Sequence, residues 1–189
     1  MKTIKYALIG ILTLLINSCK YKCEGFQESE LKWVPYEIGE TIKYTDKFDT
    51  IEFRITDFFK TESSSFSGLV MDYECDSKCY YLTSKNDELG YQLREEYNDG
   101  FDWGMKIQIT DNDRFEFDIP NNTSFSDSIK VVHKPDTLIN CTEYTNVFIV
   151  SKDTLNKSPR IGYIIKAENF GIIEFYDFYL KQKWILINN

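Results

Sequence analysis

The residues of this sequence that could catalyse a reaction are one histidine and several carboxylates. A nucleophile activated by histidine would depend on His133, in the segment VVHKPD, and the motifs G-x-S-x-G and H-E-x-x-H do not occur in the sequence. A glycosidase would need two carboxylates at a fixed separation, which a sequence does not reveal. The candidates for such a pair are Asp72, Glu74, Glu95 and Glu96. Because neither chemistry has a recognisable set of residues, we predict that the protein is not an enzyme.

The residues that could bind a metal are also too few for a predicted site. The segment Asp111–Arg114 (DNDR) has the acidic start of a calcium loop, but the sequence lacks the following glycine and the distal glutamate. Cys75 and Cys79 have a C-x₃-C spacing without a second pair of zinc ligands. We therefore predict neither a metal nor a cofactor.

The cysteines are better suited to disulfides. Besides Cys19 the sequence has Cys23, Cys75, Cys79 and Cys141, an even number that suits two disulfides in an oxidising compartment and allows three connectivities. Cys75 and Cys79 could bridge each other if they flank a tight turn, or each could pair elsewhere, for instance with Cys141. Free thiols are the main alternative.

The first 18 residues, MKTIKYALIGILTLLINS, are typical of an export signal. Lys2 and Lys5 precede the apolar run Ala7–Ile16, which is shorter than the about 20 residues needed to cross a bilayer. The segment Leu15–Cys19 (LINSC) resembles the bacterial lipobox. That resemblance implies that Cys19 is diacylated through its sulfur and becomes the first residue after cleavage. Because two acyl chains hold a protein stably at a membrane, we predict a lipid-anchored protein rather than a secreted one with a spare cysteine.

Length and charge limit the organisation and the partners of the chain. Cleavage after residue 18 leaves 171 of the 189 residues, enough for one domain with a core, and no Pro/Gly/Ser-rich linker divides them. We predict a signal peptide (1–18), a lipidated tether (19–32) and a single β domain (33–189). The formal charge is −8, and −10 without Lys2 and Lys5, which disfavours nucleic acid as a partner.

Apolar and polar residues alternate with period two through much of the domain. The pattern is clearest in Gly104–Pro120 (GMKIQITDNDRFEFDIP), where two alternating segments flank the polar turn Asp111–Arg114, as in an antiparallel hairpin. Together with an aromatic content of 16%, the pattern predicts an all-β fold, either an antiparallel sandwich or a barrel of about 8–11 strands. The alternation recurs at residues 51–55, 69–73, 129–131, 161–165 and 184–186.

Three further segments complete the expected organisation. Thr61–Gly68 (TESSSFSG) is the only polar stretch of low complexity and is predicted to be a loop. Asn86–Asn98 fits both a helix and a strand, and Gly90 favours the strand. The C-terminal segment Phe170–Asn189 is predicted to form a buried hairpin with its turn at Lys181–Lys183.

Several features together resemble small β-rich lipoproteins of the Bacteroidetes. They are the lipobox, the segment Trp33–Tyr44 (WVPYEIGETIKY), the motif G-I-I-x-F at Gly171–Phe175, and W-x-L at Trp184–Leu186. The resemblance implies that the Trp-x-Pro-Tyr-x-x-Gly part of the early segment, Trp33–Gly39, precedes the first strand and that the late glycine-apolar strand pairs with the Trp-x-Leu strand. Both tryptophans are therefore expected to be core residues. The resemblance implies no particular activity.

A second pattern resembles the O-glycosylation signal of the same bacteria, which is Asp followed by Ser or Thr and an apolar residue. The alternative is structural, since Asp often closes a turn before a strand begins. The acceptor residues would be Thr50, Ser128, Thr137 and Thr154.

The high aromatic content suggests a binding surface as one function. Glu95–Gly104 (EEYNDGFDWG) combines Tyr97, Phe101 and Trp103 with glycines and polar residues, a composition that suits an exposed loop that binds a glycan or a peptide. The alternative is a hairpin turn packed over the core.

We expect a cell-envelope lipoprotein with a non-enzymatic binding or assembly role. A carbohydrate- or peptide-binding surface lipoprotein and a lipid carrier with a β-barrel lumen are the alternatives. The expected partners are the membrane, through the lipid anchor, and a glycan, a peptide or an envelope protein. Lys20–Lys22, after the anchor, lack the acidic cluster that resembles a surface-export signal, which favours the periplasmic side of the outer membrane.

Overall fold

A computed structural model describes residues 28–67, 72–98, 104–119, 121–153 and 159–187, apart from the side chains of 28, 62–67 and 72–77. The described chain contains one 3₁₀ helix and 12 strands. These are η1 (Glu28–Trp33), β1 (Thr41–Thr45), β2 (Thr50–Ser67), β3 (Asp72–Thr83), β4 (Arg94–Asn98), β5 (Gly104–Thr110), β6 (Asp113–Asp118), β7 (Thr123–Ser124), β8 (Ile129–Ile139), β9 (Thr142–Lys152), β10 (Ile161–Ala167), β11 (Gly171–Asp177) and β12 (Gln182–Leu186).

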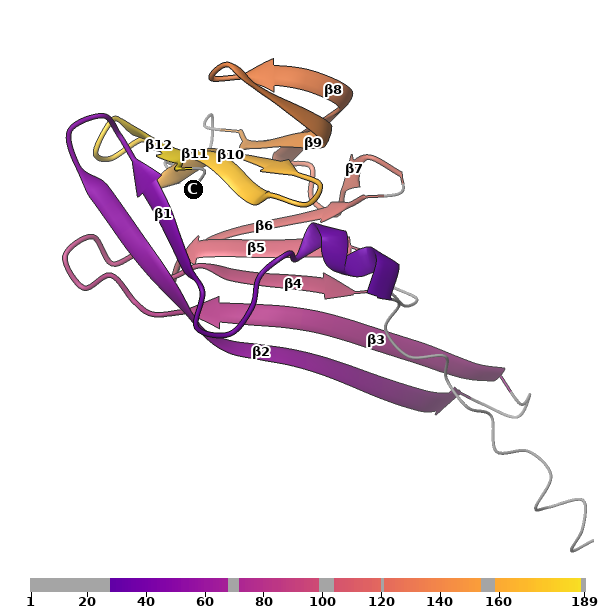
Figure 1. Cartoon of the computed structure of the whole chain (residues 1–189). Helices are drawn as coiled ribbons and strands as arrows, with labels where there is room; N and C mark the ends of the chain where they lie inside the picture. The colour runs from indigo at the N-terminus through magenta and orange to yellow at the C-terminus, as the bar shows by residue number, and fades with distance from the viewer. Residues whose placement is uncertain (1–27, 68–71, 99–103, 120, 154–158, 188–189) are drawn as a thin grey trace, which may run out of the picture.

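The strands form one antiparallel sheet that curls into a nearly closed barrel (Figure 1). Its order is β7-β6-β5-β4-β3-β2-β1-β12-β11-β10-β9-β8, so every strand except β1 and β12 pairs only with strands next to it in the chain. The pairing of β1 with β12, through Tyr44↔Leu186 and Thr45↔Ile185, joins the two halves of the chain. The sheet ends at β7 and β8, and we call the line between these two strands the seam.

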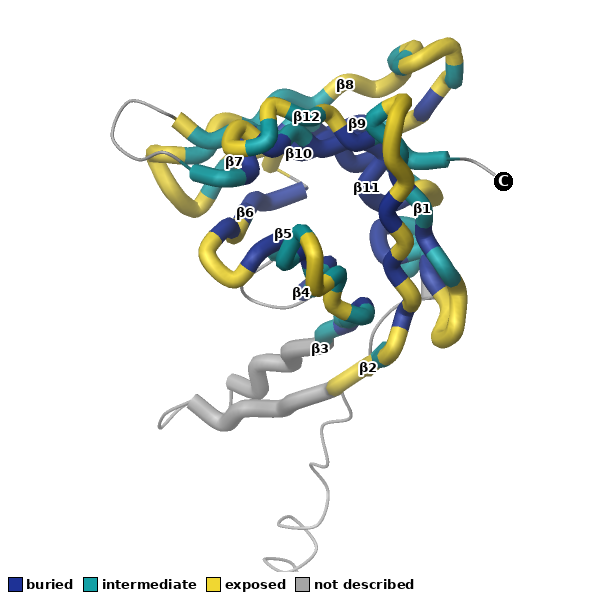
Figure 2. The backbone as a smooth tube through the Cα atoms, turned by 90° about the vertical axis from the view of Figure 1, so that its left-hand side faces the viewer, coloured by how far each residue is buried: buried dark blue, intermediate teal, exposed yellow. Residues whose placement is uncertain are grey.

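The all-β prediction is confirmed, and the choice between sandwich and barrel is decided for a barrel. Inward-facing side chains are buried, as in β5, where Met105, Ile107 and Ile109 are fully buried while Lys106 and Gln108 are partly exposed. Figure 2 shows this alternation along the tube. The 12 strands exceed the predicted number partly because β7 has only two residues, a length that no periodicity reveals.

Two predicted hairpins are confirmed, with small shifts in their turns. The first hairpin consists of β5 and β6 and ends at Asp118, and because β6 already begins at Asp113, the turn is only Asp111–Asn112. The final hairpin is β11–β12, and its turn lies at 178–181 rather than at Lys181–Lys183. In both cases backbone pairing continues into residues that the polar composition assigned to the turn.

The prediction of a loop at Thr61–Gly68 is wrong for residues 61–67. These residues continue β2, which pairs with β3 up to Ser67↔Asp72. Cross-strand pairing overrides the weak strand preference of serine, and the long β2–β3 ribbon extends beyond the barrel (Figure 1). In Asn86–Asn98 only Arg94–Asn98 is a strand, because a turn closed by the bridge Asn86↔Tyr91 comes first, with Gly90 at φ +66°.

The two ends of the barrel differ. Because neighbouring strands are antiparallel, connections that follow even-numbered strands lie at one end and those that follow odd-numbered strands lie at the other. The first, which we call the capped end, is covered by η1, where Trp33 packs edge-on against Phe148 with ring centroids 5.4 Å apart. The Asn169 N–H of the β10–β11 turn donates to the Lys32 carbonyl at 2.7 Å. The other end, which we call the cleft end, carries the candidate site.

Two of the motifs that carried the family resemblance, the one that starts at Trp33 and the one that starts at Gly171, meet at the capped end. Gly171 has φ +71°, and a Cβ there would lie 1.7 Å from the Tyr36 hydroxyl. That hydroxyl donates to the Phe170 carbonyl at 3.3 Å and accepts from the Ile172 N–H at 3.1 Å. Trp33 and Trp184 are 5% and 1% exposed, so their prediction as core residues is confirmed.

A buried ion pair crosses the barrel interior. Glu95 on β4 and Lys166 on β10 are fully buried and form a salt bridge, although their strands are six places apart in the sheet order. The Tyr81 hydroxyl donates to the other Glu95 carboxylate oxygen at 2.5 Å. Burial lowers the pKa of Lys166 because the ammonium group loses its hydration, and the charge of Glu95 partly offsets this effect.

Candidate binding cleft

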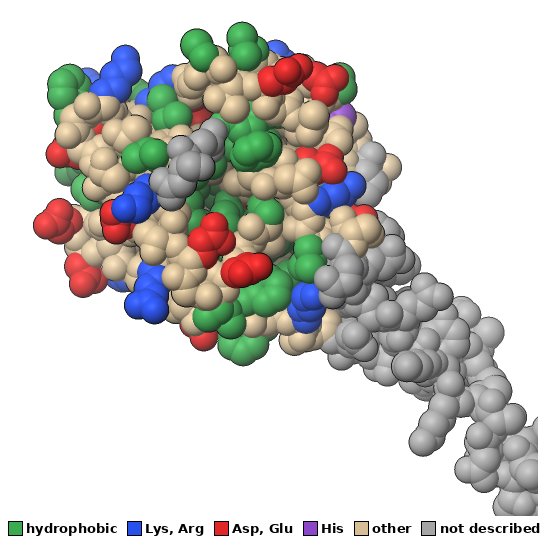
Figure 3. Space-filling view, in the orientation of Figure 1, with side chains coloured by type: hydrophobic (Ala, Val, Ile, Leu, Met, Phe, Trp, Pro, Cys, Tyr) green, Lys and Arg blue, Asp and Glu red, His purple; other side chains and the backbone are tan. Residues whose placement is uncertain are grey.

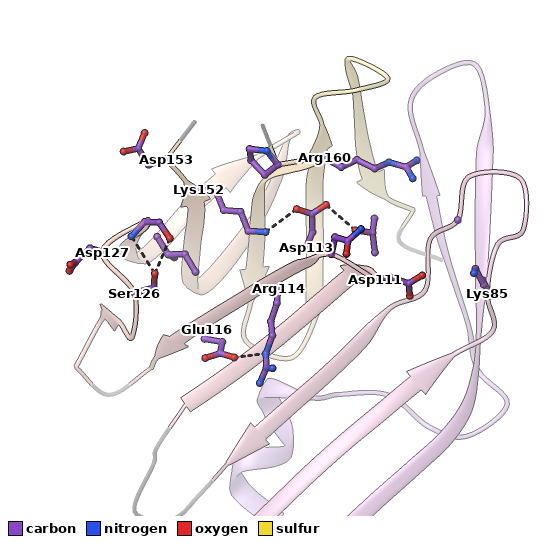
Figure 4. A pocket seen from close by; sticks show the side chains of 16 residues that line it. Lys85, Asp111, Asp113, Arg114, Glu116, Ser126, Asp127, Lys152, Asp153 and Arg160 are labelled. Carbon is purple, nitrogen blue, oxygen red and sulfur yellow. Dashed lines mark hydrogen bonds and ion pairs between the residues drawn. The ribbon is translucent and has the colours of Figure 1, made fainter. Parts of the chain in front are cut away.

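A cleft of about 1060 Å³ opens at the cleft end of the barrel, beside the seam (Figure 4). Its size is at the upper end of what small-ligand sites usually have, roughly 300–1,000 Å³. Its lining comes from several connections at this end, namely the β3–β4 and β7–β8 links, the β5–β6 turn, and the described residues on either side of 154–158 between β9 and β10. The charged side chains of the lining include Lys85, Asp113, Arg114, Asp127, Lys152 and Arg160.

Asp113 is the structural centre of the cleft floor. It is 3% exposed, and its Oδ1 accepts from the Lys152 ammonium at 2.9 Å. Its Oδ2 accepts from the Thr110 hydroxyl at 2.9 Å and from the Ile161 N–H at 3.1 Å. Asp113 begins β6, whereas Lys152 ends β9 and Ile161 begins β10, so this one carboxylate links strands on both sides of the seam.

A second buried carboxylate holds Arg160 at the cleft wall. Asp177 is fully buried, and its Oδ2 accepts from Arg160 Nε at 2.7 Å and from the Tyr91 hydroxyl at 2.6 Å. The Arg160 guanidinium also lies over the Tyr91 ring, 4.6 Å from its centroid. Burial raises the pKa of Tyr91, and its hydrogen bond to Asp177 adds to the increase. Tyr91 is therefore a neutral donor at physiological pH.

The cleft contains charges of both signs that are largely paired. Arg114 and Glu116 form a salt bridge on the outer face of β6, and Lys152 and Arg160 have the partners given above. Lys85, Asp111 and Asp127 are exposed at the mouth. Figure 3 shows the same mixture on the face seen in Figure 1, where acidic and basic side chains are interspersed. The cleft therefore offers donors and acceptors without a strong net field.

The described residues include no cluster of three or more His, Cys, Asp or Glu placed to hold a metal ion. The acids of the DNDR segment instead have different roles: Asp113 is buried in the cleft floor, and Asp111 is exposed at the mouth.

The described residues of the predicted ligand loop do not line this cleft. Tyr97 lies in β4, is 1% exposed, and its hydroxyl donates to Glu30 at 3.1 Å. It is therefore not available as a surface platform, because it is a core residue of β4. Phe101 and Trp103 lie outside the described residues.

The carboxylates considered for a glycosidase do not form a pair in the described structure. Glu95 points into the barrel, whereas Glu96 faces outward and forms a salt bridge with Lys106, 3.5 Å away. The side chains of Asp72 and Glu74 are outside the described set. His133 lies on β8 against Phe148, with ring centroids 4.8 Å apart.

The cysteines form no disulfide among the described residues. Cys75 and Cys79 both lie in β3, so the tight turn that would let them bridge each other does not exist. Four residues of extended strand span about 13 Å, and a disulfide needs Cα atoms roughly 4.4–6.8 Å apart. Cys79 is buried, and Cys141 is an exposed thiol in the β8–β9 turn. Cys19, Cys23 and the side chain of Cys75 lie outside the described set.

The four candidate glycosylation residues have different surroundings. Thr50 is exposed and begins β2, and Ser128 is exposed just before β8, so both match the structural alternative of a turn that leads into a strand. Thr137 is half-buried within β8, and Thr154 lies outside the described residues.

Sequence reasoning did not find the cleft. The closest signal was the DNDR segment, all four of whose residues line it, but the lining residues near the β3–β4 and β9–β10 links are more than 20 positions away in the chain. No described helix is long and apolar enough to cross a membrane. Comparison with protein-family models, with curated proteins and with solved structures found no match to the chain.

Proposed function

We propose that the protein is a lipid-anchored β-barrel of a bacterial cell envelope that binds a polar ligand in the cleft. The observation that supports binding is the cleft itself, with a volume of about 1060 Å³ and a lining of charged residues held in place by buried carboxylates. Such preorganised polar groups are typical of a binding site.

The position of the proposed anchor is compatible with this role. Cys19 precedes η1 by nine positions, and η1 lies at the capped end. A tether of that length reaches at most about 30 Å. The cleft is at the opposite end and would face away from the membrane, where a ligand could enter it. We propose that the protein is located on the periplasmic side of the outer membrane. We also propose disulfides that involve Cys23 or Cys75.

The role of lipid carrier has less support. A carrier needs an apolar lumen, whereas the described interior contains the Glu95–Lys166 ion pair, the Tyr81 hydroxyl and close-packed rings such as Tyr44 and Phe175, 5.3 Å apart. Among the roles considered, binding of a glycan or a peptide fits the polar cleft best.

The experiment uses the full chain, expressed in a bacterial host with a labelled fatty acid and purified in detergent. We expect label on the wild type and none on Cys19→Ala. We then expect binding in a screen of glycans and linear peptides, with affinity reduced about tenfold or more in Asp127→Arg, because the charge at the cleft mouth is reversed.

The matched control is Glu143→Arg, the same charge reversal at an exposed position of β9 toward the capped end, which should bind like the wild type. An unlabelled wild type would refute the anchor. Equal binding by Asp127→Arg and Glu143→Arg, or no binding at all, would refute the cleft as the site.

A further inference from the structure

The edge of β8 next to the cleft has backbone groups without a ladder partner in the described chain. β8 has 11 residues and ends the sheet, whereas β7, which faces it across the seam, has only two. An edge strand of this kind is the usual template for adding another strand.

The register identifies the backbone groups that point to the seam. The Asp153 N–H donates to the Ser128 carbonyl at 2.8 Å, so residues 128 and 153 form a hydrogen-bonded pair. In an antiparallel ladder such pairs alternate with pairs whose N–H and C=O groups point to the other side. Continuing from Ile129↔Lys152, the backbone groups of Val131 and His133 point away from β9 and toward the seam.

This free edge begins where the cleft lies. Ser126–Ile129 line the cleft on one side, and Arg114 and Glu116 of β6 line it on the other. Val131 and His133 are half-buried, so a ligand in the cleft could extend along them. Farther along β8, Lys134, Pro135 and Asp136 bring two charges and a proline, the residues that block strand addition on natural edges. The open stretch is thus confined to the part of β8 nearest the cleft.

We propose that the ligand of the cleft is an extended polypeptide segment of another protein, which pairs as a strand with β8 at Val131 and His133. This inference rests on the proposed function and specifies its ligand. Donors and acceptors that repeat every two residues, about 7 Å, match a peptide backbone, whereas a saccharide has no such repeat. The mixed charges of the lining suit the varied side chains of a peptide.

The test uses the tightest linear peptide that the full chain selects from a displayed random library. Val131→Pro removes the seam-facing N–H, and Val131→Ala is its control, because it loses the same side-chain packing and keeps that N–H. We expect Val131→Pro to bind at least about tenfold more weakly and Val131→Ala to stay within about twofold of wild type, with thermal unfolding showing that both fold.

A second measurement uses only wild-type protein, so it does not depend on the proline variant folding. Single N-methyl groups placed along the peptide should weaken binding at alternate positions, where the peptide N–H faces β8, and leave it unchanged between them.

The remaining outcomes separate this inference from the proposed function. Peptides that bind without alternation and with equal loss in the two Val131 variants would overturn strand pairing and leave the cleft as a binding site. Binding of glycans but of no peptide would also overturn strand pairing and leave the cleft as a binding site. A dimer that Val131→Pro dissociates would overturn the inference in favour of a second copy of the chain. Absence of any ligand would refute both.

Discussion

At the scale of single residues, the Glu95–Lys166 pair is expected to have a large effect on stability. Both side chains are fully buried, and each is the counter-ion of the other. Removing one partner leaves an uncompensated buried charge, which typically costs about 3–5 kcal/mol. Replacing both with apolar residues of similar size removes the desolvation cost as well as the attraction.

We therefore predict that Glu95→Leu lowers the free energy of unfolding by about 3–5 kcal/mol, and that the double variant Glu95→Leu/Lys166→Met regains most of that loss. Urea denaturation of the three proteins measures these free energies. Additive losses in the double variant would contradict the pairing, because independent sites add and coupled ones do not.

At the scale of elements, the connection between β10 and β11 depends on close approach of two backbone segments. Gly171 has a positive φ and is in contact with the Tyr36 hydroxyl, which bonds to the backbone on both sides of it. The glycine thus serves both the turn and the attachment of the segment that precedes β1.

Gly171→Ala should lower the free energy of unfolding by more than about 2 kcal/mol, because backbone strain adds to the displacement of Tyr36. Gly39→Ala is the control, since Gly39 has φ +89° but a Cβ there would meet nothing within 4 Å. Its loss should be limited to the strain of about 1–2 kcal/mol. Equal losses in the two variants, measured by urea denaturation, would show that contact with Tyr36 contributes nothing.

At the scale of the whole molecule, the buried tyrosines link stability to alkaline pH. Burial raises the pKa of Tyr36, Tyr44 and Tyr81 well above 10, and nearby groups, including Glu95, add to the increase. In the unfolded chain these hydroxyls ionise near pH 10. The folded state therefore keeps protons that the unfolded state has lost, and stability falls as the pH rises above about 10. Lys166, whose pKa is lowered, has the opposite effect, but only below its ordinary value of 10.5.

We predict that the free energy of unfolding falls above about pH 10, by up to roughly 1.4 kcal/mol per pH unit for each such tyrosine, and that Tyr44→Phe makes the fall shallower. Denaturation at a series of pH values measures the slope, and tyrosinate absorbance reports ionisation. A slope that Tyr44→Phe leaves unchanged would show that this hydroxyl does not titrate with unfolding.

The sequence alone determined the fold class, most strand positions and the two hairpins, because side chains in a half-buried strand alternate locally and turns need particular residues. It also predicted that Trp33 and Trp184 belong to the core. Barrel closure was decided only by the tertiary structure, since the β1–β12 pairing joins residues at least 140 positions apart. The cleft was also decided only by the tertiary structure. Asp113, Lys152 and Arg160 are ordinary surface-type residues in the sequence, and only the curvature of the sheet brings them together. Periodicity records which face of a strand is buried, but not which distant strand will lie beside it.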